Sequence, residues 1–472
     1  MKESLVNFFS LSVGLRGGCA LGVALAFSPV AGAQTNFSPL STSGPVSNRY
    51  CVVFLAEGYR TNQYTQFLVD ATNAVNLLLA RQPYVSYSTH FNFYALAVPS
   101  VDSGSDHPQF NWYSNTFFNT TYDLGNFLLN MPTNHLGQGR VDSLLNTFLP
   151  TADLAILLVN DATPGGSDGG GRTALVSSGA ATASSPFSYI LVHETGHVVA
   201  GLGDEYTDAL PYPDTEEPNT TRETNRAAIK WNAWIATNTP VPTPPTFDYL
   251  DVVGLFEGAH YHSAGWYRPQ QRCLMRDATS EFCQVCREAM VLAFHQAVRP
   301  VDSFVPTNTS FSVASTQWLD FSLTLVSPAD HALNVHWYTN NVLVTGATNS
   351  SLTLSPATLG NGSHSVQAII ADPTAWVRND PSNRLGQTIV WSLNVSLPAL
   401  TLSHLRLASG GGFAFRVSGF APNGVSIHTS TNLVNWIAVS TNNLVEGQFD
   451  YTNYPAGNFL RRFFRAQTPP AP

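Results

Sequence analysis

Charged residues are scarce in this chain of 472 residues: Asp, Glu, Lys and Arg together make up 11%, where an average soluble protein has about 25%. Lys and Arg total 22 against 31 Asp and Glu, and the formal net charge is −9. A nucleic-acid binder needs a basic stripe that displaces counterions from phosphates, and electrostatic docking on an anionic membrane needs a basic patch. We therefore expect neither kind of partner.

Long apolar runs are also lacking. The N-terminal apolar stretch Cys19–Phe27 is far shorter than the roughly 20 residues that span a bilayer. Lys2 and Arg16 precede this stretch, and the small residues Ala31-Gly32-Ala33 follow it. This order is typical of a secretory signal peptide over residues 1–33, with an uncleaved anchor as the alternative. We expect a secreted product, extracellular or periplasmic, with no integral membrane span.

Cysteine is rare, with five residues in the chain. Removal of the signal peptide leaves Cys51, Cys273, Cys283 and Cys286. An even number in an oxidising compartment favours disulfides, which can pair in three ways. A structural zinc site that uses Cys283 and Cys286 is the alternative. We favour disulfides because export works against free thiolates, and the sequence leaves the pairing open.

Residues 34–300 have mixed α/β character, because short apolar runs alternate with segments of helical spacing. This alternation favours a sheet with at least one covered face. We expect strands at Cys51–Leu55 and Leu154–Val159, and helices over Tyr64–Ala80, Thr224–Ile235 and Cys286–Ala297.

After Pro300 the pattern changes to short alternating strands separated by turn residues. About seven strands in about 95 residues predict an immunoglobulin-like β-sandwich over residues 301–397, with Trp337 in its core. Residues 398–472 predict a small β accessory module. Its strands are expected near Phe413–Val417, Val425–Thr429 and Trp436–Val439.

The chemistry lies in the motif His193-Glu194-Thr-Gly-His197. On a helix the two histidines lie one turn apart on the same face, so both imidazoles can bind one zinc ion. Glu194 adjoins the first histidine and can act as general base towards a metal-bound water, whose pKa zinc lowers. Ser185 can cap this helix and Pro186 suits its first turn. The structural alternative is a helical histidine pair beside a surface Glu.

A third ligand is expected beyond the helix. Gly201 is suited to end the helix, and the turn that follows can bring Asp204 or Glu205 to the metal. A hydrolase also benefits from a group that stabilises the oxyanion. Tyr267 and Tyr261 are candidates, and so are the nearby histidines; of these we choose Tyr267.

Several blocks of the sequence, in order over roughly residues 50–295, resemble the IgA peptidase family of zinc metallopeptidases. The most specific blocks are His193–Tyr206, which extends the zinc motif, and Cys273–Arg276. The resemblance implies a metzincin-like catalytic domain in which Met275 lies in a turn beneath the zinc and supports it by packing. Metzincin third ligands are His or Asp, so the resemblance favours Asp204 over Glu205.

Strand Leu154–Val159 precedes a glycine-rich segment, Gly165–Gly171. The resemblance implies that a sheet edge above the zinc takes an extended peptide as an added strand, and the glycines would leave room for its backbone. A flexible surface loop is the alternative interpretation.

The sequence thus predicts an α/β (α+β) zinc peptidase domain at 34–300, followed by the two β domains. We expect a secreted endopeptidase with one catalytic zinc, which acts on protein or peptide substrates. The first alternative is a binding or adhesion protein whose β modules attach to glycan or a cell surface. A row of exposed aromatic residues after residue 300 would favour it. The second is a hydrolase of a non-peptide amide, which a small closed pocket would favour.

Overall fold

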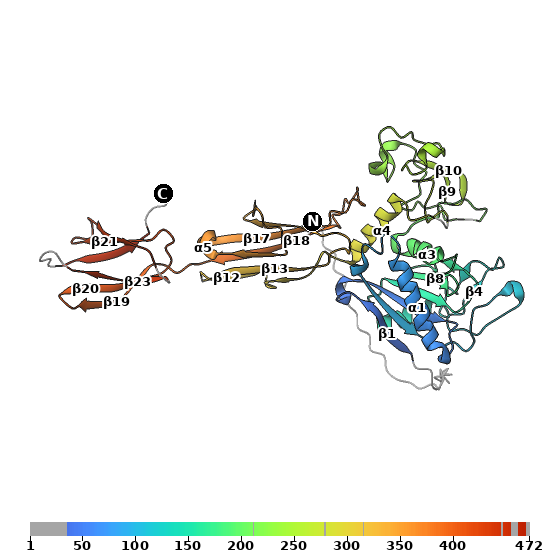
Figure 1. Ribbon diagram of the computed structural model, residues 1–472, viewed down its shortest axis with the longest axis horizontal. Helices are drawn as coiled ribbons and strands as arrows, with labels where there is room; N and C mark the ends of the chain where they lie inside the picture. The colour runs from blue at the N-terminus through green and yellow to red at the C-terminus, as the bar shows by residue number, and fades with distance from the viewer. Residues whose placement is uncertain are drawn as a thin grey trace, which may run out of the picture.

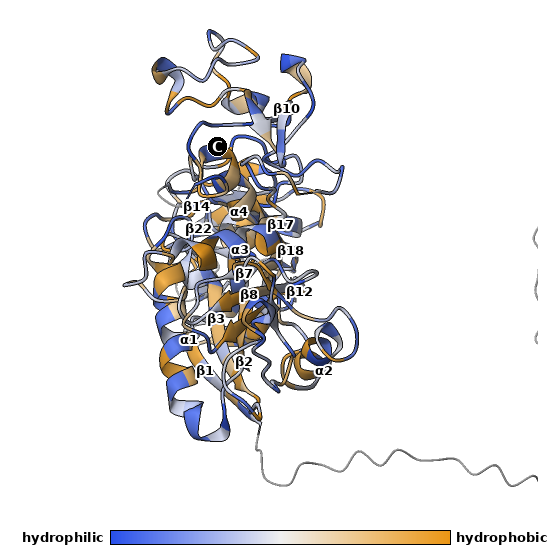
Figure 2. Ribbon diagram, turned by 90° about the vertical axis from the view of Figure 1, so that its right-hand side faces the viewer, coloured by the Kyte–Doolittle hydropathy of each residue, from blue (hydrophilic) through white to orange (hydrophobic). Residues whose placement is uncertain are grey.

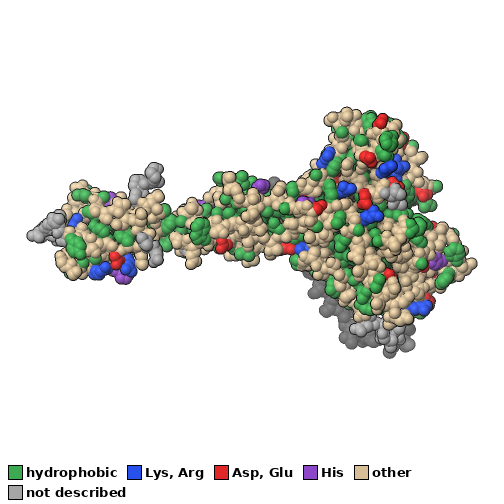
Figure 3. Space-filling model, viewed as in Figure 1, with side chains coloured by type: hydrophobic (Ala, Val, Ile, Leu, Met, Phe, Trp, Pro, Cys, Tyr) green, Lys and Arg blue, Asp and Glu red, His purple; other side chains and the backbone are tan. Residues whose placement is uncertain are grey.

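The computed structural model describes residues 35–210, 212–277, 280–314, 316–444, 447–454 and 461–468. The predicted signal peptide, residues 1–33, lies outside them. Three parts follow one another along the long axis: an α/β body with a smaller lobe, a β-sandwich and a C-terminal β module (Figure 1). None of the helices among these residues is long and apolar enough to cross a membrane. On the face drawn in Figure 3, Lys and Arg are scattered over a mostly uncharged surface.

A six-stranded mixed sheet forms the centre of the body. Its spatial order is β1 (Asn36–Thr42), β3 (Phe91–Ala97), β2 (Tyr50–Glu57), β6 (Leu154–Val159), β8 (Thr173–Ser177) and β7 (Gly166–Ser167). The four inner strands are parallel, and both edge strands are antiparallel to their neighbours. Every residue of β2 and β6 is buried, which explains why both predicted strands read as continuous apolar runs.

Helices cover both faces of this sheet, and α1 and α2 lie on opposite sides of it (Figure 2). Val52 and Phe54 of β2 enter one core, whereas Val53 and Leu55 enter the other, because successive side chains of a strand point to opposite faces. The first core contains residues of α1 (Tyr64–Leu79), α3 (Tyr189–Ala200) and α4 (Gln284–Ala297), and the second those of α2 (Gln138–Phe148). The predictions of α1 and α4 are confirmed, and α2 was not predicted.

The predicted helix over Thr224–Ile235 is wrong. This segment holds two short 3-10 turns, Arg226–Ala228 and Asn232–Trp234. Its large apolar side chains are nevertheless buried, namely Ile229, Trp231, Trp234 and Ile235. The indole of Trp231 donates to the carbonyl of Gly254 at 2.8 Å. Tertiary packing, and not helical periodicity, therefore accounts for the spacing of its apolar residues. The adjoining lobe carries the hairpin β9 (Phe256–Ala259) and β10 (His262–Arg268).

Residues 301–397 form two sheets around one core. Trp337 is fully buried in this core, as predicted, and its ring stacks on that of Trp391 with 5.8 Å between centroids. One sheet has the order β11 (Val301–Val305), β13 (Leu319–Leu325), β16 (Ser351–Leu354); the other has β12 (Ser310–Val313), β18 (Gly386–Val395), β17 (Gly362–Ala371), β14 (Asn334–Thr339), β15 (Val342–Leu343).

The C-terminal module has two three-stranded sheets and a smaller core that includes Phe415 and Ile427. The three strands predicted there are present as β20 (Gly412–Ser418), β21 (Val425–Ser430) and β22 (Ile437–Asn442), with bounds extended or shifted by one to three residues. The sheets are β19 (Thr401–Ala408), β20 (Gly412–Ser418), β23 (Gln448–Asn453) and β22 (Ile437–Asn442), β21 (Val425–Ser430), β24 (Phe463–Gln467).

Buried polar contacts fix the sandwich to the body. The guanidinium of Arg49 contacts both oxygens of Asp302, at 2.7 and 2.8 Å. Asp372 accepts a hydrogen bond from the hydroxyl of Tyr87 at 2.8 Å, and its Oδ2 lies 3.0 Å from Nε2 of His295. Such geometry ties the first β domain to the body by directional, desolvated bonds.

Candidate active site

Helix α3 carries the predicted histidine pair and the glutamate between them. It ends at Gly201, as predicted, where φ is 62° and the glycine N–H bonds to the carbonyl of His197 at 2.9 Å. Glycine adopts this left-handed conformation without a steric penalty. The chain then turns back and brings Asp204 against both histidines.

The start of α3 differs from the prediction. The helix begins at Tyr189, and Ser188 occupies the N-cap position without a side-chain cap. Ser185, the predicted cap, lies in the preceding turn, where its hydroxyl accepts a hydrogen bond from the N–H of Phe187 at 3.1 Å. The metal-ligand spacing of the helix is unaffected.

His193, His197 and Asp204 form a triangle of ligand atoms. Nε2 of His193 lies 3.2 Å from Nε2 of His197 and 3.1 Å from Oδ1 of Asp204, and the third edge is 3.4 Å. Zinc bonds of about 2.0–2.1 Å in a tetrahedral site put neighbouring ligand atoms about 3.3 Å apart. Oδ1 of Asp204 is buried and accepts no hydrogen bond within the described residues. The triangle therefore fits one zinc ion.

The other ring nitrogens are engaged by carbonyls. Nδ1 of His193 lies 3.1 Å from the carbonyl oxygen of Leu274, and Nδ1 of His197 lies 2.6 Å from that of Leu202. A carbonyl only accepts, so each Nδ1 carries the proton and each Nε2 presents a lone pair to the metal position. These contacts set both the ring orientation and the tautomer.

Met275 lies in a turn beneath the helix and is fully buried. A Cβ placed on Gly196 would lie 3.0 Å from the sulfur of Met275, so the methionine packs directly under the turn that separates the two histidines. The carbonyl of Met275 also accepts the N–H of Glu205 at 2.8 Å. This segment therefore supports the ligand triangle by packing and by a backbone hydrogen bond.

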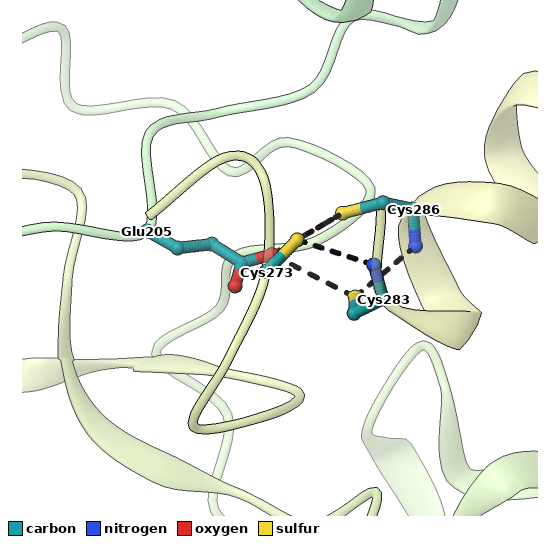
Figure 4. A group of neighbouring side chains, drawn as sticks. All are labelled: Glu205, Cys273, Cys283 and Cys286. Atoms are coloured by element: carbon teal, nitrogen blue, oxygen red, sulfur yellow. Dashed lines mark hydrogen bonds between the residues drawn. The ribbon is translucent and has the colours of Figure 1, made fainter. Parts of the chain in front are cut away.

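The side chain of Glu205 points away from the histidines, into a second cluster of potential ligands. We call this group, composed of Glu205, Cys273, Cys283 and Cys286, the cysteine–glutamate cluster (Figure 4). The preference for disulfides has to be corrected, since these cysteines and Cys51 are all free. Cys51 lies in the opposite core of the sheet. Pairing by count failed because it ignores which residues the fold brings together.

The side chain of Glu194 projects from α3 towards the edge strand β7. A Cβ on Gly166 would stand 2.5 Å from Cγ2 of Ile190 and 2.9 Å from Cγ of Glu194. Only glycine therefore leaves room for the carboxylate at this edge. Burial raises the pKa of Glu194 above its ordinary value, although the two histidines oppose the shift. A carboxylate with a raised pKa is a stronger proton acceptor.

Two hollows, with volumes of about 430 and 390 Å³, adjoin the ligand triangle. His193 and Glu194 line both, and β7 contributes Ser167 to one hollow and Gly166 to the other. The lining of the smaller hollow combines apolar residues, among them Phe127, with charged ones such as Arg276 and Asp277. Phe127 is 55% exposed, so this hollow opens to solvent. The edge strand beside the site is β7, whereas the predicted strand β6 is interior.

The tyrosines of the site differ from the one selected by sequence. Tyr261 lines both hollows, and its hydroxyl lies 3.2 Å from that of Tyr206, which also lines both. Tyr206 had no role in the sequence-based prediction, although it belongs to the extended motif. Tyr267 lines neither hollow; it pairs with Glu257 in the hairpin, and its N–H donates to the carbonyl of Thr221 at 2.8 Å.

Comparison with protein families finds a match over the α/β body. The family model described as IgA Peptidase M64 matches residues 38–251 and 247–294, which together are more than half of the chain. No curated protein matches the chain.

Three solved structures that match this chain have low TM-scores. The fibronectin(III)-like modules of Clostridium thermocellum CbhA have a TM-score of 0.15 at 8% identity, covering 32% of this chain and 77% of that chain. Bacteroides uniformis beta-glucuronidase 3 gives 0.13 at 8%, covering 44% and 28%. A chaperone–tip adhesin complex of CFA/I fimbriae gives 0.14 at 13%, covering 36% and 98%.

Proposed function

Because the chain belongs to the IgA peptidase M64 family and is therefore a peptidase, we propose that it is a secreted, zinc-dependent endopeptidase. In this proposal residues 34–300 form a metzincin-like catalytic domain, and the sandwich after residue 300 is immunoglobulin-like. The observation that carries the proposal is the triangle of His193, His197 and Asp204, whose edges of 3.1–3.4 Å suit a tetrahedral zinc site.

These three residues would hold the zinc. The ion would supply Lewis-acid chemistry, lowering the pKa of a water molecule and polarising the substrate carbonyl. The ordinary pKa of an aspartate carboxyl group is about 3.9, well below neutral pH. The carboxylate is therefore ionised and ready to act as a ligand at neutral pH.

Glu194 is the general base. It takes a proton from the attacking water and then delivers it to the nitrogen of the leaving amine, as a single carboxylate can do in the two halves of amide hydrolysis. Gly166 leaves the space that the carboxylate occupies, and burial raises the pKa of Glu194. Both features support a base positioned beside the ligand triangle.

Tyr261 is the best-placed group to stabilise the oxyanion, in place of the predicted Tyr267. It lines both hollows next to the triangle. Burial raises the pKa of its phenol, so the hydroxyl keeps its proton and can donate it to a developing negative charge. The hydroxyl of Tyr206, at 3.2 Å, can orient it.

The two hollows favour a polypeptide substrate. They extend from the shared residues His193 and Glu194; the smaller opens to solvent at Phe127, and the larger at the exposed Thr133 and Asp168. A chain can therefore continue past the reacting bond in both directions. The edge strand β7 offers backbone groups for an added strand. These hollows do not form the closed pocket that would favour a small amide substrate.

The adhesion alternative finds no support in the described part of the two β domains. The large aromatic side chains exposed there, Trp318 and Tyr454, belong to different modules and form no row. We therefore keep the β domains as accessory parts of the proposed enzyme.

Removal and return of the metal test this function. Treatment of the purified mature protein with a chelator should abolish cleavage of a denatured protein substrate, and stoichiometric zinc should restore it. His197→Ala should bind one zinc ion fewer than the wild type and remain inactive when zinc is added. Full cleavage by the metal-free protein would refute the proposal.

A further inference from the structure

The cysteine–glutamate cluster lies directly behind the candidate catalytic site. Its four side chains come from three segments and converge on one point (Figure 4). Glu205 follows Asp204, Cys273 precedes the Met275 turn, and the other two cysteines lie at the start of α4. All four are buried, with Cys283 the most exposed at 5%.

Distances within the cluster suit a metal better than a disulfide. Sγ of Cys286 lies 3.6 Å from Sγ of Cys273 and 3.2 Å from Oε1 of Glu205, and the latter oxygen is 3.9 Å from Sγ of Cys283. Tetrahedral zinc puts two sulfur ligands about 3.8 Å apart, and a sulfur and an oxygen about 3.5 Å apart. A disulfide requires about 2.05 Å and would leave one of the three thiols over.

Hydrogen bonds to the cluster favour negatively charged sulfur. The backbone N–H of Cys283 donates to Sγ of Cys273 at 3.3 Å, and that of Cys286 donates to Sγ of Cys283 at 3.4 Å. Two of the sulfurs lie at the N-terminal end of α4, where the helix dipole stabilises anions. These donors are the outer contacts that thiolate ligands of a metal require.

Glu205 gives an independent indication of a missing partner. Its side chain is fully buried. Oε1 accepts a hydrogen bond from Nδ2 of Asn219 at 2.9 Å and also contacts the sulfurs of Cys286 and Cys283, whereas Oε2 accepts no hydrogen bond among the described residues. Burial of a carboxylate in this state is costly. A cation among the three sulfurs removes that cost.

We propose that the cysteine–glutamate cluster binds a second zinc ion, which is structural. Four protein ligands close its coordination sphere, as is typical of structural sites, and leave no position for substrate. Thiolate ligands select zinc over the hard cations magnesium and calcium.

This ion stabilises the catalytic ligands through the backbone. Cys273 is followed by Leu274, whose carbonyl orients His193. The next residue is Met275, whose carbonyl accepts the N–H of Glu205. Glu205 itself is bonded to Asp204. One structural zinc thus joins the Met275 turn, the third catalytic ligand and α4 into a single unit.

Zinc content and X-ray absorption of the full-length mature protein test the proposal. The wild type should contain two zinc ions per chain. His197→Ala empties only the catalytic triangle, so one zinc should remain, with about three sulfur neighbours at about 2.3 Å and one oxygen at about 2.0 Å. A remaining zinc with only nitrogen and oxygen neighbours, or no zinc at all in this variant, overturns the proposal.

Cysteine variants give the reciprocal result. Cys286→Ser should lose the sulfur-bound zinc, whereas Cys51→Ala, a matched change of a buried cysteine in the opposite core, should keep two zinc ions. Peptide mapping of the alkylated wild type shows which cysteines form disulfides. It needs no variant, so its result does not depend on whether a variant folds. A disulfide between any two of Cys273, Cys283 and Cys286 overturns the proposal. Neither result depends on peptidase activity, so failure of the proposed function would be recognised separately.

Discussion

Asp204 and Glu205 are consecutive residues whose carboxylates lie in two different ligand clusters. Oδ1 of Asp204 is 3.1 Å from Nε2 of His193, whereas Oε1 of Glu205 is 3.2 Å from Sγ of Cys286. A single peptide bond therefore links the ligand triangle to the cysteine–glutamate cluster. The two acids, which the sequence offered as alternatives for one role, have separate roles in this account.

Asp204→Asn should separate these roles. The amide keeps the size of the carboxylate but loses its charge. Affinity for the catalytic zinc should therefore fall by at least about 100-fold. Loss of a residue that only supports a ligand lowers metal affinity by up to about 100-fold, and loss of a ligand should cost no less. Chelator competition measures this affinity, and the sulfur-bound zinc should stay in place. An unchanged affinity for both ions would contradict the assignment of Asp204.

Tyr261→Phe removes the hydroxyl proposed to stabilise the oxyanion. We expect kcat to fall by about 100-fold, which is typical for loss of one such donor, with KM and zinc content nearly unchanged. Tyr267→Phe in the same assay tests the residue that the sequence suggested. A larger loss of kcat in Tyr267→Phe than in Tyr261→Phe would reverse our assignment.

Gly166→Ala should displace the general base. The new methyl group would stand 2.5 Å from Ile190 and 2.9 Å from Cγ of Glu194, closer than non-bonded carbons approach. Activity should therefore fall at least about 10-fold while zinc remains bound. Gly139→Ala on α2 is the control, because its Cβ would meet only ordinary contacts beginning at 3.4 Å. Equal activity of both variants would contradict the crowding at β7.

Asp372 should make the junction between body and sandwich sensitive to acid. Burial raises its pKa, but contacts with His295, His331 and Tyr87 outweigh burial and hold the pKa below its ordinary value. A lowered folded-state pKa gives stability that is present above the unfolded pKa, about 4, and is lost as pH falls through the folded value. The raised pKa of His331 adds stability that is complete below about pH 6.5 and is lost as pH rises through its folded value.

Calorimetry of the wild type and Asp372→Asn between pH 3 and pH 8 measures this contribution. The variant should lose about 3 kcal/mol of unfolding free energy near pH 5, since removal of one partner of a buried pair leaves the other unpaired. The difference should shrink as the pH approaches 3. The exposed Asp251→Asn is the control and should follow the wild type. A constant difference across this range would contradict the linkage.

Local patterns predicted those parts of the molecule in which one segment determines its own structure. The apolar spacing of α1 and the histidine spacing of α3 need only helical geometry, and the strands β2 and β6 need only their apolar length. Residues Thr224–Ile235 have similar spacing, but their side chains enter a core built by distant segments, so the pattern misled.

The site could be predicted only as far as the helix and the turn after it. The resemblance favours Asp204 as the third ligand, but the role of Glu205 depends on cysteines that begin about 70 residues later, at Cys273. The same is true of Tyr261, which reaches the hollows because it and His260 have positive φ values, 60° and 56°. A regular strand would have pointed these side chains elsewhere.

The most direct test of the central claim is cleavage of a proteome-derived peptide library by the mature protein beside Glu194→Gln, with new peptide termini read by mass spectrometry. We predict new termini with the wild type and none with the variant, while both proteins contain the same amount of zinc. Equal cleavage by Glu194→Gln would contradict the assignment of Glu194 as the general base.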